Sequence, residues 1–399
     1  MAYDFDTPIQ RKDSDCIKFD GAAEQGLSPD LLPLWVADMD FRTAPEILAA
    51  LHSRVDHGIF GYTATLRGYA QAVDAWMHDN YGWLVAPEQI VMTSGVVNAL
   101  AMAVRAFTRP GDGVIIQQPV YHPFASVVTG NGRVLMNTPL LLDEATSHYH
   151  MDFDALEQAA AQPNTKLMLL CNPHNPVGRA WTRPELQRVL DICLANDVIV
   201  VSDEIHMDFI RPGHEHVSLG TFGPEVLQRC AICTSASKTF NLAALQCANT
   251  VIPNESLRRA FKREISACGC HGPNLLGMAA TQAAYEHGAP WLRELKEYLE
   301  GNWTLLDDTL RELHERSGVA LTLVPAQSTY LAWVDCRGLG MDASELERFI
   351  QDEAGLWLDC GHEFGPEGTG FVRINLATQR AFLQRALDQL CDAVYRRLK

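Results

Sequence analysis

Residues 198–206 read VIVVSDEIH, an apolar run that ends abruptly in charged residues. The run predicts a buried strand over Val198–Ser202, because β-branched residues favour strands and no charge interrupts them. Asp203 follows the strand directly, and a carboxylate in such a place is costly unless it has a partner. The stretch therefore predicts a strand that delivers a carboxylate to a site.

Four runs of the same kind occur elsewhere in the chain: Gln89–Thr93, Gly113–Gln117, Lys166–Cys171 and Ala231–Thr234. The runs alternate with longer helical stretches, which indicates an α/β fold with a mostly parallel sheet and helices on its faces. Four of the five runs end close to a distinctive polar or glycine-rich stretch: Ser94-Gly95, Asn172 to Gly178, Asp203 to Asp208, and Ser235 to Lys238. Because doubly wound sheets bind ligands at the carboxyl ends of their strands, we expect these stretches to converge on one crevice.

The character of the chain changes after Pro290. A long helical stretch over 291–315 leads to the alternating segment TLVPAQSTYLAWVDC, and then to a further helix, a glycine-rich loop and FVRIN. We predict a large domain over residues 45–290 with a seven-stranded sheet. A smaller α+β domain is expected from residues 1–44 together with residues 291–399. No repeat or low-complexity linker marks the boundary.

Composition excludes several classes of function. The formal net charge of −17 argues against a nucleic-acid surface, which needs clustered Lys and Arg. The first residues, MAYDFDTPIQRKDSD, lack the apolar core of a signal peptide, and no segment has the apolar length of a membrane span. The 11 cysteines are an odd number scattered through apolar stretches, which fits reduced thiols. We expect a cytoplasmic protein with neither nucleic-acid nor membrane partners.

A zinc site is the competing interpretation of two cysteine-containing segments. Cys230 and Cys233, followed by Cys268, Cys270 and His271, superficially offer soft ligands. Cys233 lies in a predicted strand, where residues three apart face opposite sides and cannot chelate together. We therefore expect no metal.

Lys238 is the chemically most suggestive residue, although its own segment is a weak signal. Ser235-Ala236-Ser237-Lys238 follows a strand, so the amine is expected at the strand's end rather than along a helix face. A surface lysine is the plain alternative. The stretch from Asn172 to Gly178, NPHNPVG, similarly allows an ordinary tight turn.

Taken together and in order, these segments resemble fold-type I pyridoxal-phosphate (PLP) enzymes, the aspartate aminotransferase superfamily. Within it, the chain resembles the MalY/PatB group of cystathionine β-lyases and related carbon–sulfur lyases. Seven segments carry this likeness: LPLWVADMDF (32–41), FGYT (60–63), DEIHMD (203–208), SKTFNLAALQ (237–246), HGAPWL (287–292), QSTYLAW (327–333) and GFVRIN (370–375). The resemblance implies a fold with a PLP-binding large domain and a smaller second domain.

The resemblance assigns roles around the cofactor ring. Lys238 carries PLP, and its freed amine then removes the proton from the substrate Cα, a task that requires a lowered pKa. Asp203 keeps the pyridine nitrogen protonated, so that the ring acts as an electron sink. Asn175 hydrogen-bonds the phenolic oxygen, and Tyr121 stacks on the ring as a further catalytic residue, unless it is only a core tyrosine. His206 is a contact behind the cofactor.

The resemblance also assigns residues to the phosphate. Gly95, Val96 and Val97 open a helical stretch directly after a strand, and backbone N–H groups at a helix N-terminus bind phosphate. Ser235 is a plausible additional phosphate ligand. Tyr62 matches a tyrosine that reaches the neighbouring subunit's site, which implies a homodimer with shared active sites.

Arg373 is the expected clamp for the substrate α-carboxylate. It lies between Val372 and Ile374 in GFVRIN, and a planar guanidinium can bind a carboxylate bidentately. A buried structural ion pair is the alternative. Ala37, in WVADMD, is expected to pass close to the same carboxylate, and Tyr62 is expected to contact the substrate from the partner.

Two positions favour a lyase over an aminotransferase. Gln246 stands where many aminotransferases carry a phosphate-binding Arg, and His206 stands where they usually have Tyr. Both match the carbon–sulfur lyases, whose β-elimination from L-cystathionine or another S-substituted L-cysteine gives a thiol, pyruvate and ammonia. Ala236 and Ala244 depart from the group's usual residues and put only local packing in doubt. An aminotransferase and a PLP-binding regulatory protein with low turnover remain the alternatives.

Overall fold

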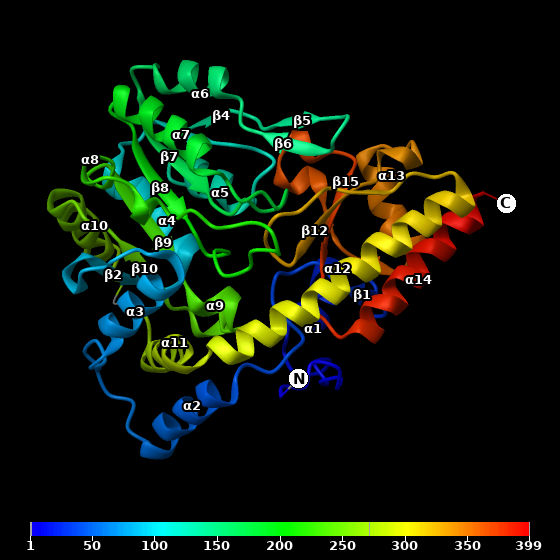
Figure 1. Ribbon diagram of the computed structural model, residues 1–399, viewed down its shortest axis with the longest axis horizontal. Coiled ribbons are helices and arrows are strands. Elements are labelled where there is room, and N and C mark those ends of the chain that lie inside the picture. The colour runs from blue at the N-terminus through cyan, green and yellow to red at the C-terminus, as the bar shows by residue number, and fades with distance from the viewer. Residues whose placement is uncertain (1, 271, 399) are drawn as a thin grey trace.

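The computed structural model describes residues 2–270 and 272–398. A seven-stranded sheet lies at the centre of its larger part, and Figure 1 shows the arrangement of these strands. In order across the sheet, the strands are β2 (Ile90–Thr93), β10 (Ala248–Val251), β9 (Cys230–Thr234), β8 (Ile199–Asp203), β7 (Thr165–Cys171), β3 (Gly113–Ile116) and β4 (Val134–Asn137). β10 runs antiparallel to both of its neighbours, and the other pairs are parallel. The five strands predicted from the sequence are present, each displaced by no more than one residue at either end.

Helices cover both faces of this sheet, which explains why its strands are apolar throughout. Along β7, Leu167 and Leu169 pack on one face, whereas Met168 and Leu170 pack on the other. The first face is covered by α4 (Val96–Phe107), α5 (Pro123–Thr129) and α10 (Glu255–Ala267). The second face is covered by α3 (Tyr69–Tyr81), α6 (Phe153–Ala160), α7 (Arg183–Ala195) and α11 (Leu275–His287).

A second, smaller sheet has its own apolar core. It is antiparallel and contains β11 (Thr322–Leu323), β12 (Leu331–Asp335), β15 (Phe371–Asn375) and β14 (Asp359–Cys360). α13 (Ala343–Arg348) and α14 (Arg380–Arg397) pack in the same core, and β1 (Leu32–Pro33) pairs in parallel with β13 (Leu356–Trp357). The N-terminal segment thus joins the C-terminal part of the chain.

The long helix α12 (Ala289–Ser317) links the two cores and runs beside α14 (Figure 1). Trp291 and Leu295, in its first half, pack in the core of the large sheet, whereas Leu306 and Leu310 pack in the core of the small sheet. The helix predicted over 291–315 is therefore present and slightly longer. Because one helix contributes to both cores, the boundary at residue 290 stays a prediction.

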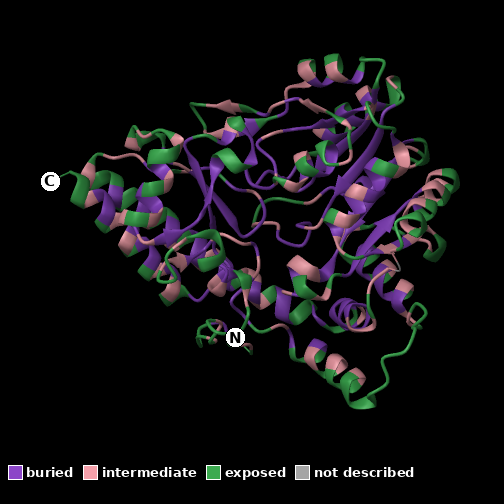
Figure 2. Cartoon of the chain, turned by 180° about the vertical axis from the view of Figure 1, so that it is seen from behind, coloured by how far each residue is buried: buried purple, intermediate pink, exposed green. Residues whose placement is uncertain are grey.

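The remaining elements are short or peripheral. They are α1 (Ile17–Asp20), α2 (Pro45–His57), α8 (Pro224–Leu227), α9 (Ala236–Thr239) and the hairpin of β5 (Leu141–Asp143) and β6 (His148–His150). After α2, residues 58–65 are exposed and stand away from the body of the molecule (Figure 2). Within the described residues, no helix combines the length and apolarity needed to cross a membrane.

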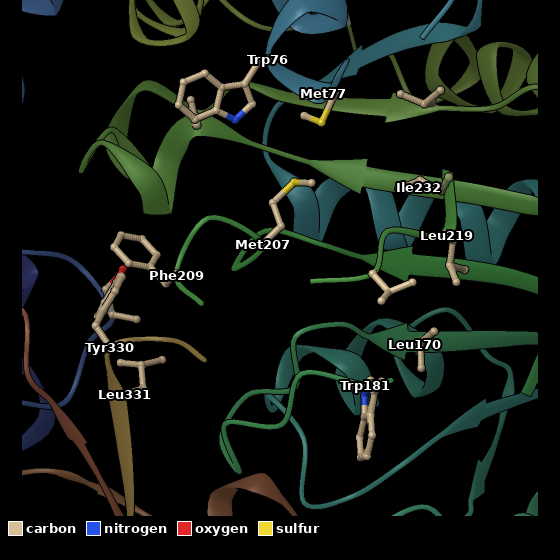
Figure 3. Packing of buried hydrophobic residues seen from close by; sticks show 14 of the residues in the cluster. Trp76, Met77, Leu170, Trp181, Met207, Phe209, Leu219, Ile232, Tyr330 and Leu331 are labelled. Atoms are coloured by element: carbon tan, nitrogen blue, oxygen red, sulfur yellow. The ribbon is translucent and has the colours of Figure 1, made fainter. Parts of the chain in front are cut away.

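Aromatic and sulfur-containing side chains join the two sheets beside the ends of the large sheet's strands. Met207 and Phe209 follow β8, and the ring of Phe209 lies 4.7 Å from the ring of Tyr330 (Figure 3). The Thr329 N–H donates to the Phe209 carbonyl at 2.7 Å. These contacts hold the small sheet against the edge where the polar stretches converge.

Candidate active site

A cavity of about 270 Å³ lies at the carboxyl ends of the large sheet's strands. Nine of the predicted site residues line it: Ala37, Gly95, Val96, Val97, Tyr121, Asn175, Asp203, His206 and Lys238. Ser237 and Gln246 line it as well. Residues as far apart as Ala37 and Gln246, 209 positions along the chain, therefore share one crevice, as the sequence predicts.

Lys238 projects into this crevice from α9, a single helical turn that begins straight after β9. The lysine therefore lies just beyond the strand's end, as expected, but on a helical turn that the Ser235 side chain caps by accepting from the Ser237 N–H. The Lys238 Nζ donates to the Ala37 carbonyl at 2.6 Å, and the Tyr330 hydroxyl donates to the same oxygen. Burial, followed by the charge of Arg373, lowers the pKa of Lys238 to about 8.

Asp203 and His206 are buried groups whose polar atoms are incompletely partnered. The Asp203 carboxylate accepts from the Ile205 N–H at 3.0 Å, and burial raises its pKa to about 7. Burial, followed by the charges of Lys238 and Arg373, lowers the pKa of His206 to about 3, so its imidazole is neutral at pH 7. The His206 Nδ1 is buried without a hydrogen-bond partner. Such groups indicate a ligand, because buried polar atoms are ordinarily satisfied.

The N-terminus of α4 offers an anion site at one end of the crevice. Gly95 has a φ of +99°, and a Cβ atom added to it would meet no heavy atom within 4 Å. The N–H groups of Val96 and Val97 begin a helix of 12 residues and have no intrahelical acceptor. Open space in front of these groups suits a phosphate.

Ser235 lies differently from the expectation. The residue is only 4 % exposed, and its hydroxyl donates to the Cys247 carbonyl at 2.7 Å. It does not line the crevice, because it is used to cap α9, and the hydroxyl-bearing residue that lines the crevice is Ser237. The Ser237 hydroxyl is hydrogen-bonded to the Ser235 hydroxyl at 2.9 Å, and the sequence pattern does not distinguish the two serines.

Arg373 lies on β15 and is 3 % exposed. Its Nη1 donates to the Asn175 Oδ1 at 3.0 Å, and its Nη2 donates to the Trp35 carbonyl at 3.0 Å and to the Asp359 carboxylate. The arginine therefore contacts a crevice residue, Asn175, and also forms the buried ion pair that was the alternative interpretation. Tyr121 joins the same group through its N–H, which donates to the Asn175 carbonyl at 3.0 Å.

Tyr62 lies away from the crevice of its own chain. The residue is fully exposed, and its neighbours Ile59 and Phe60 are 68 % and 62 % exposed. The structure describes a single chain, so the prediction that Tyr62 reaches a partner's site stays a prediction.

Sequence reasoning missed two carboxylates that support the site. Asp359 is the partner of Arg373, and Asp208 accepts from Thr239, the residue after Lys238. Both are buried, at 8 % and 6 % exposure, and Asp359 directly follows the apolar run Leu356–Leu358. A buried carboxylate after an apolar run was the signal that identified Asp203, and the same signal was available for Asp359 in LWLDC.

The cysteines considered for zinc lie on different elements. Cys230 and Cys233 are buried in β9, Cys268 is exposed after α10, and His271 lies outside the described residues. Among the residues that the structure describes, no group of three or more His, Cys, Asp or Glu side chains is arranged to hold a metal ion.

Residues 29–390 match the family described as aminotransferase class I and II. The chain belongs to this family. Proteins that resemble it over nearly the whole length include the cystathionine β-lyase PatB of Bacillus subtilis, which is 39 % identical over 98 % of this chain and 99 % of PatB. Protein MalY of Escherichia coli is 34 % identical with the same coverage.

A solved structure agrees with the class I and II assignment. Cystalysin from Treponema denticola, which contains a pyridoxal 5'-phosphate cofactor, superposes with a TM-score of 0.95 at 36 % identity, and all of both chains is covered. The resemblance to the MalY/PatB group stated from seven segments is therefore confirmed over the full length. The predicted PLP-enzyme fold is confirmed as well.

Proposed function

We propose that this chain is a PLP-dependent carbon–sulfur β-lyase, which converts L-cystathionine or a related S-substituted L-cysteine into a thiol, pyruvate and ammonia. One observation carries the proposal: Lys238, with its pKa near 8, shares a crevice with Asp203 and lies close enough to Arg373 for that charge to lower its pKa. The full-length similarity to PatB, named a cystathionine β-lyase, supports the same reaction.

The crevice residues fit PLP. Asp203, buried with a single backbone donor, would pair with the pyridine nitrogen, and the unpartnered Nδ1 of His206 lies in the same cavity. The N–H groups that open α4 behind Gly95 would hold the phosphate. Tyr121 would cover the ring, and the Asn175 amide would donate to its phenolic oxygen. When bound, PLP supplies an electron sink for charge that develops at the substrate Cα.

The chain's own residues then perform the proton transfer and the orientation. Arg373 binds the α-carboxylate through its planar guanidinium. A Lys238 amine with a pKa near 8 is partly neutral at physiological pH and accepts the Cα proton, while the Ala37 carbonyl holds its Nζ in place. The Cβ–S bond breaks as the sulfur leaves with the bonding electron pair. The remaining unsaturated amine takes up water and yields pyruvate and ammonia.

Two crevice residues support elimination rather than transamination. Gln246 and His206 both line the cavity, at the positions where the sequence resembles carbon–sulfur lyases. Transamination would require Lys238 to return the same proton to the cofactor, so the constellation by itself permits both reactions. The lyase names of the most similar relatives support elimination.

The exposed segment after α2 supports a homodimer. Ile59, Phe60 and Tyr62 present large apolar surfaces to solvent in the single chain, and a second copy would cover them. In that arrangement Tyr62 reaches the partner's phosphate and substrate. We place the enzyme in the cytoplasm, because its 11 cysteines are all free.

A panel of sulfur-containing amino acids tests the function. We expect purified holoenzyme to release pyruvate from L-cystathionine or an S-alkyl-L-cysteine, and to form little keto acid from amino acids without sulfur. The Lys238→Ala variant is the control, and its rate should fall by at least about 10⁴-fold, because it loses both the cofactor anchor and the base. Wild-type pyruvate release no higher than that of Lys238→Ala would refute the lyase.

A further inference from the structure

The guanidinium of Arg373 is partly occupied by the protein itself. Nη2 carries two hydrogens, and both are used, one by the Trp35 carbonyl and one by the Asp359 carboxylate. Nη1 donates one hydrogen to Asn175, and Nε is buried without a partner. A bidentate grip on a carboxylate needs Nη2 together with either Nη1 or Nε. A substrate carboxylate therefore has to displace one of the two Nη2 acceptors.

Asp359 is the acceptor that can move. The Trp35 carbonyl is main chain in the segment that follows β1, whereas the Asp359 carboxylate is a side chain that can rotate on β14. Once displaced, that carboxylate lies beside a second negative charge, the substrate's own. Its side chain is 11 % exposed, so water does little to weaken the repulsion. The displaced Asp359 needs either a proton or a cation.

A second cavity adjoins this pair. Its volume is about 490 Å³, and Asp359 forms part of its wall together with Trp35, His122, Trp357 and Glu363. The rings of Trp35 and Trp357 stack at 4.4 Å. His122 lies in the wall between this cavity and the crevice, because its ring lies 4.9 Å from the ring of Tyr121, which lines the crevice. The wall is aromatic and acidic, which suits a cation carried on an aliphatic chain.

We propose that Asp359 is a specificity-determining residue that selects substrates with a positive charge on the sulfur substituent. The substrate carboxylate takes the place of Asp359 on Arg373, and the released Asp359 pairs with the ammonium group of the substituent in the adjoining cavity. The substrate class is S-aminoalkyl-L-cysteines and their aminocarboxyalkyl counterparts. This inference rests on the proposed lyase function, because it assigns Arg373 to the substrate carboxylate.

Two isosteric substrates measure the selection. S-(2-aminoethyl)-L-cysteine and S-propyl-L-cysteine differ by an ammonium in place of a methyl group. We expect the holoenzyme to prefer the cationic thioether by at least about tenfold in kcat/KM for pyruvate release, the size of one partly buried charge pair. Asp359→Asn keeps the shape and removes the charge, so the preference should fall to within about twofold of unity.

Matched variants separate selection from a general loss of structure. Asp359→Glu keeps the charge and should retain most of the preference. Glu300 is also the carboxylate partner of an arginine, because it lies 2.9 Å from Arg211 in a cavity away from the crevice. Glu300→Gln removes this carboxylate charge and should leave the ratio unchanged. A wild-type ratio below about twofold overturns the inference, and so does an unchanged ratio in a folded Asp359→Asn.

A binding measurement keeps the inference apart from the lyase function. L-lysine and 2-aminoheptanoic acid are the corresponding pair without a sulfur to eliminate, and their dissociation constants can be measured by calorimetry on the holoenzyme. We expect L-lysine to bind more tightly, by about tenfold, and to lose this advantage in Asp359→Asn. If no thioether yields pyruvate, the lyase proposal fails while this binding ratio still decides the role of Asp359. Equal dissociation constants for L-lysine and 2-aminoheptanoic acid refute the proposed role of Asp359.

Discussion

The protein buries charged side chains in two neighbouring regions, and it treats them in opposite ways. In the N-terminal segment, two cations face two carboxylates: Lys18 lies 2.8 Å from Asp40, and Arg11 lies 2.6 Å from both Asp38 and Asp40. In the crevice, Asp203 has one backbone donor. No ion pair is formed by Lys238 or by Asp203 among the residues that the structure describes.

The difference separates charged groups that stabilise the fold from charged groups that take part in binding and proton transfer. A buried ion pair with good geometry offsets the cost of removing both charges from water. Burial without such a partner instead shifts the pKa, to about 8 for Lys238 and about 7 for Asp203. Groups that must exchange a proton or bind a cofactor need that shift. The paired cluster lies next to the crevice, because Asp38 follows Ala37, whose carbonyl holds Lys238.

The strongest test of the comparison breaks the paired cluster. Lys18 is fully buried, so Lys18→Met leaves Asp40 with fewer counter-charges inside the protein. We expect the free energy of unfolding to fall by about 3–5 kcal/mol. Denaturant unfolding of the cofactor-free protein measures it. Lys262→Met, at an exposed position, is the control and should change stability by no more than about 0.5 kcal/mol. Equal effects of the two substitutions would contradict the structural role of the cluster.

The second test removes an unpaired charge and should act in the opposite direction. The pKa of Asp203 is raised to about 7 in the fold, so the folded chain keeps a proton that the unfolded chain releases above about pH 4. Stability of the cofactor-free protein should therefore fall as pH rises from about 4 to about 7. Asp203→Asn should abolish this slope and stabilise the cofactor-free protein at pH 8, by up to about 4 kcal/mol.

Denaturant unfolding at pH 4, 6 and 8 measures this slope in both proteins. The same Asp203→Asn variant should lose pyruvate release by roughly 10²- to 10³-fold, because its neutral amide cannot favour a protonated ring nitrogen. A variant that is less stable than wild type at pH 8 would show that Asp203 is a structural charge like Asp40.

The third test addresses an intermediate case, a buried carboxylate that is satisfied by neutral donors. Asp208 accepts from the Trp76 Nε1 at 3.1 Å and from the hydroxyls of Tyr81 and Thr239. Thr239→Val removes one of the three donors and should lower the free energy of unfolding by about 1–2 kcal/mol. Thr304→Val, on the exposed side of α12, is the control and should cost less than about 0.5 kcal/mol. If the two variants are equally stable, the Thr239 hydrogen bond contributes nothing net.

The sequence predicts the strands and the site best where one signal serves both. VIVVSDEIH shows a buried strand and, at its end, a carboxylate that needs a partner, and β8 indeed places Asp203 in the crevice. Ser235 is less clear from the sequence, because a capping hydroxyl and a ligand-binding hydroxyl have the same sequence pattern. Which of two hydroxyls in one turn faces the cavity depends on backbone dihedrals that the pattern does not encode.

The sequence by itself determined that mostly parallel strands carry their polar ends to one edge, because strands that alternate with helices run parallel. The order of the strands and the antiparallel β10 were decided by the tertiary structure. The sequence also determined the kinds of group that arrive there, a lysine, a carboxylate and an arginine. Only the tertiary structure decided their partners: Ala37 for Lys238 across 201 positions, and Asp359 for Arg373 across a strand register. Such pairs depend on how separate elements pack, and packing reflects the whole chain rather than any one segment.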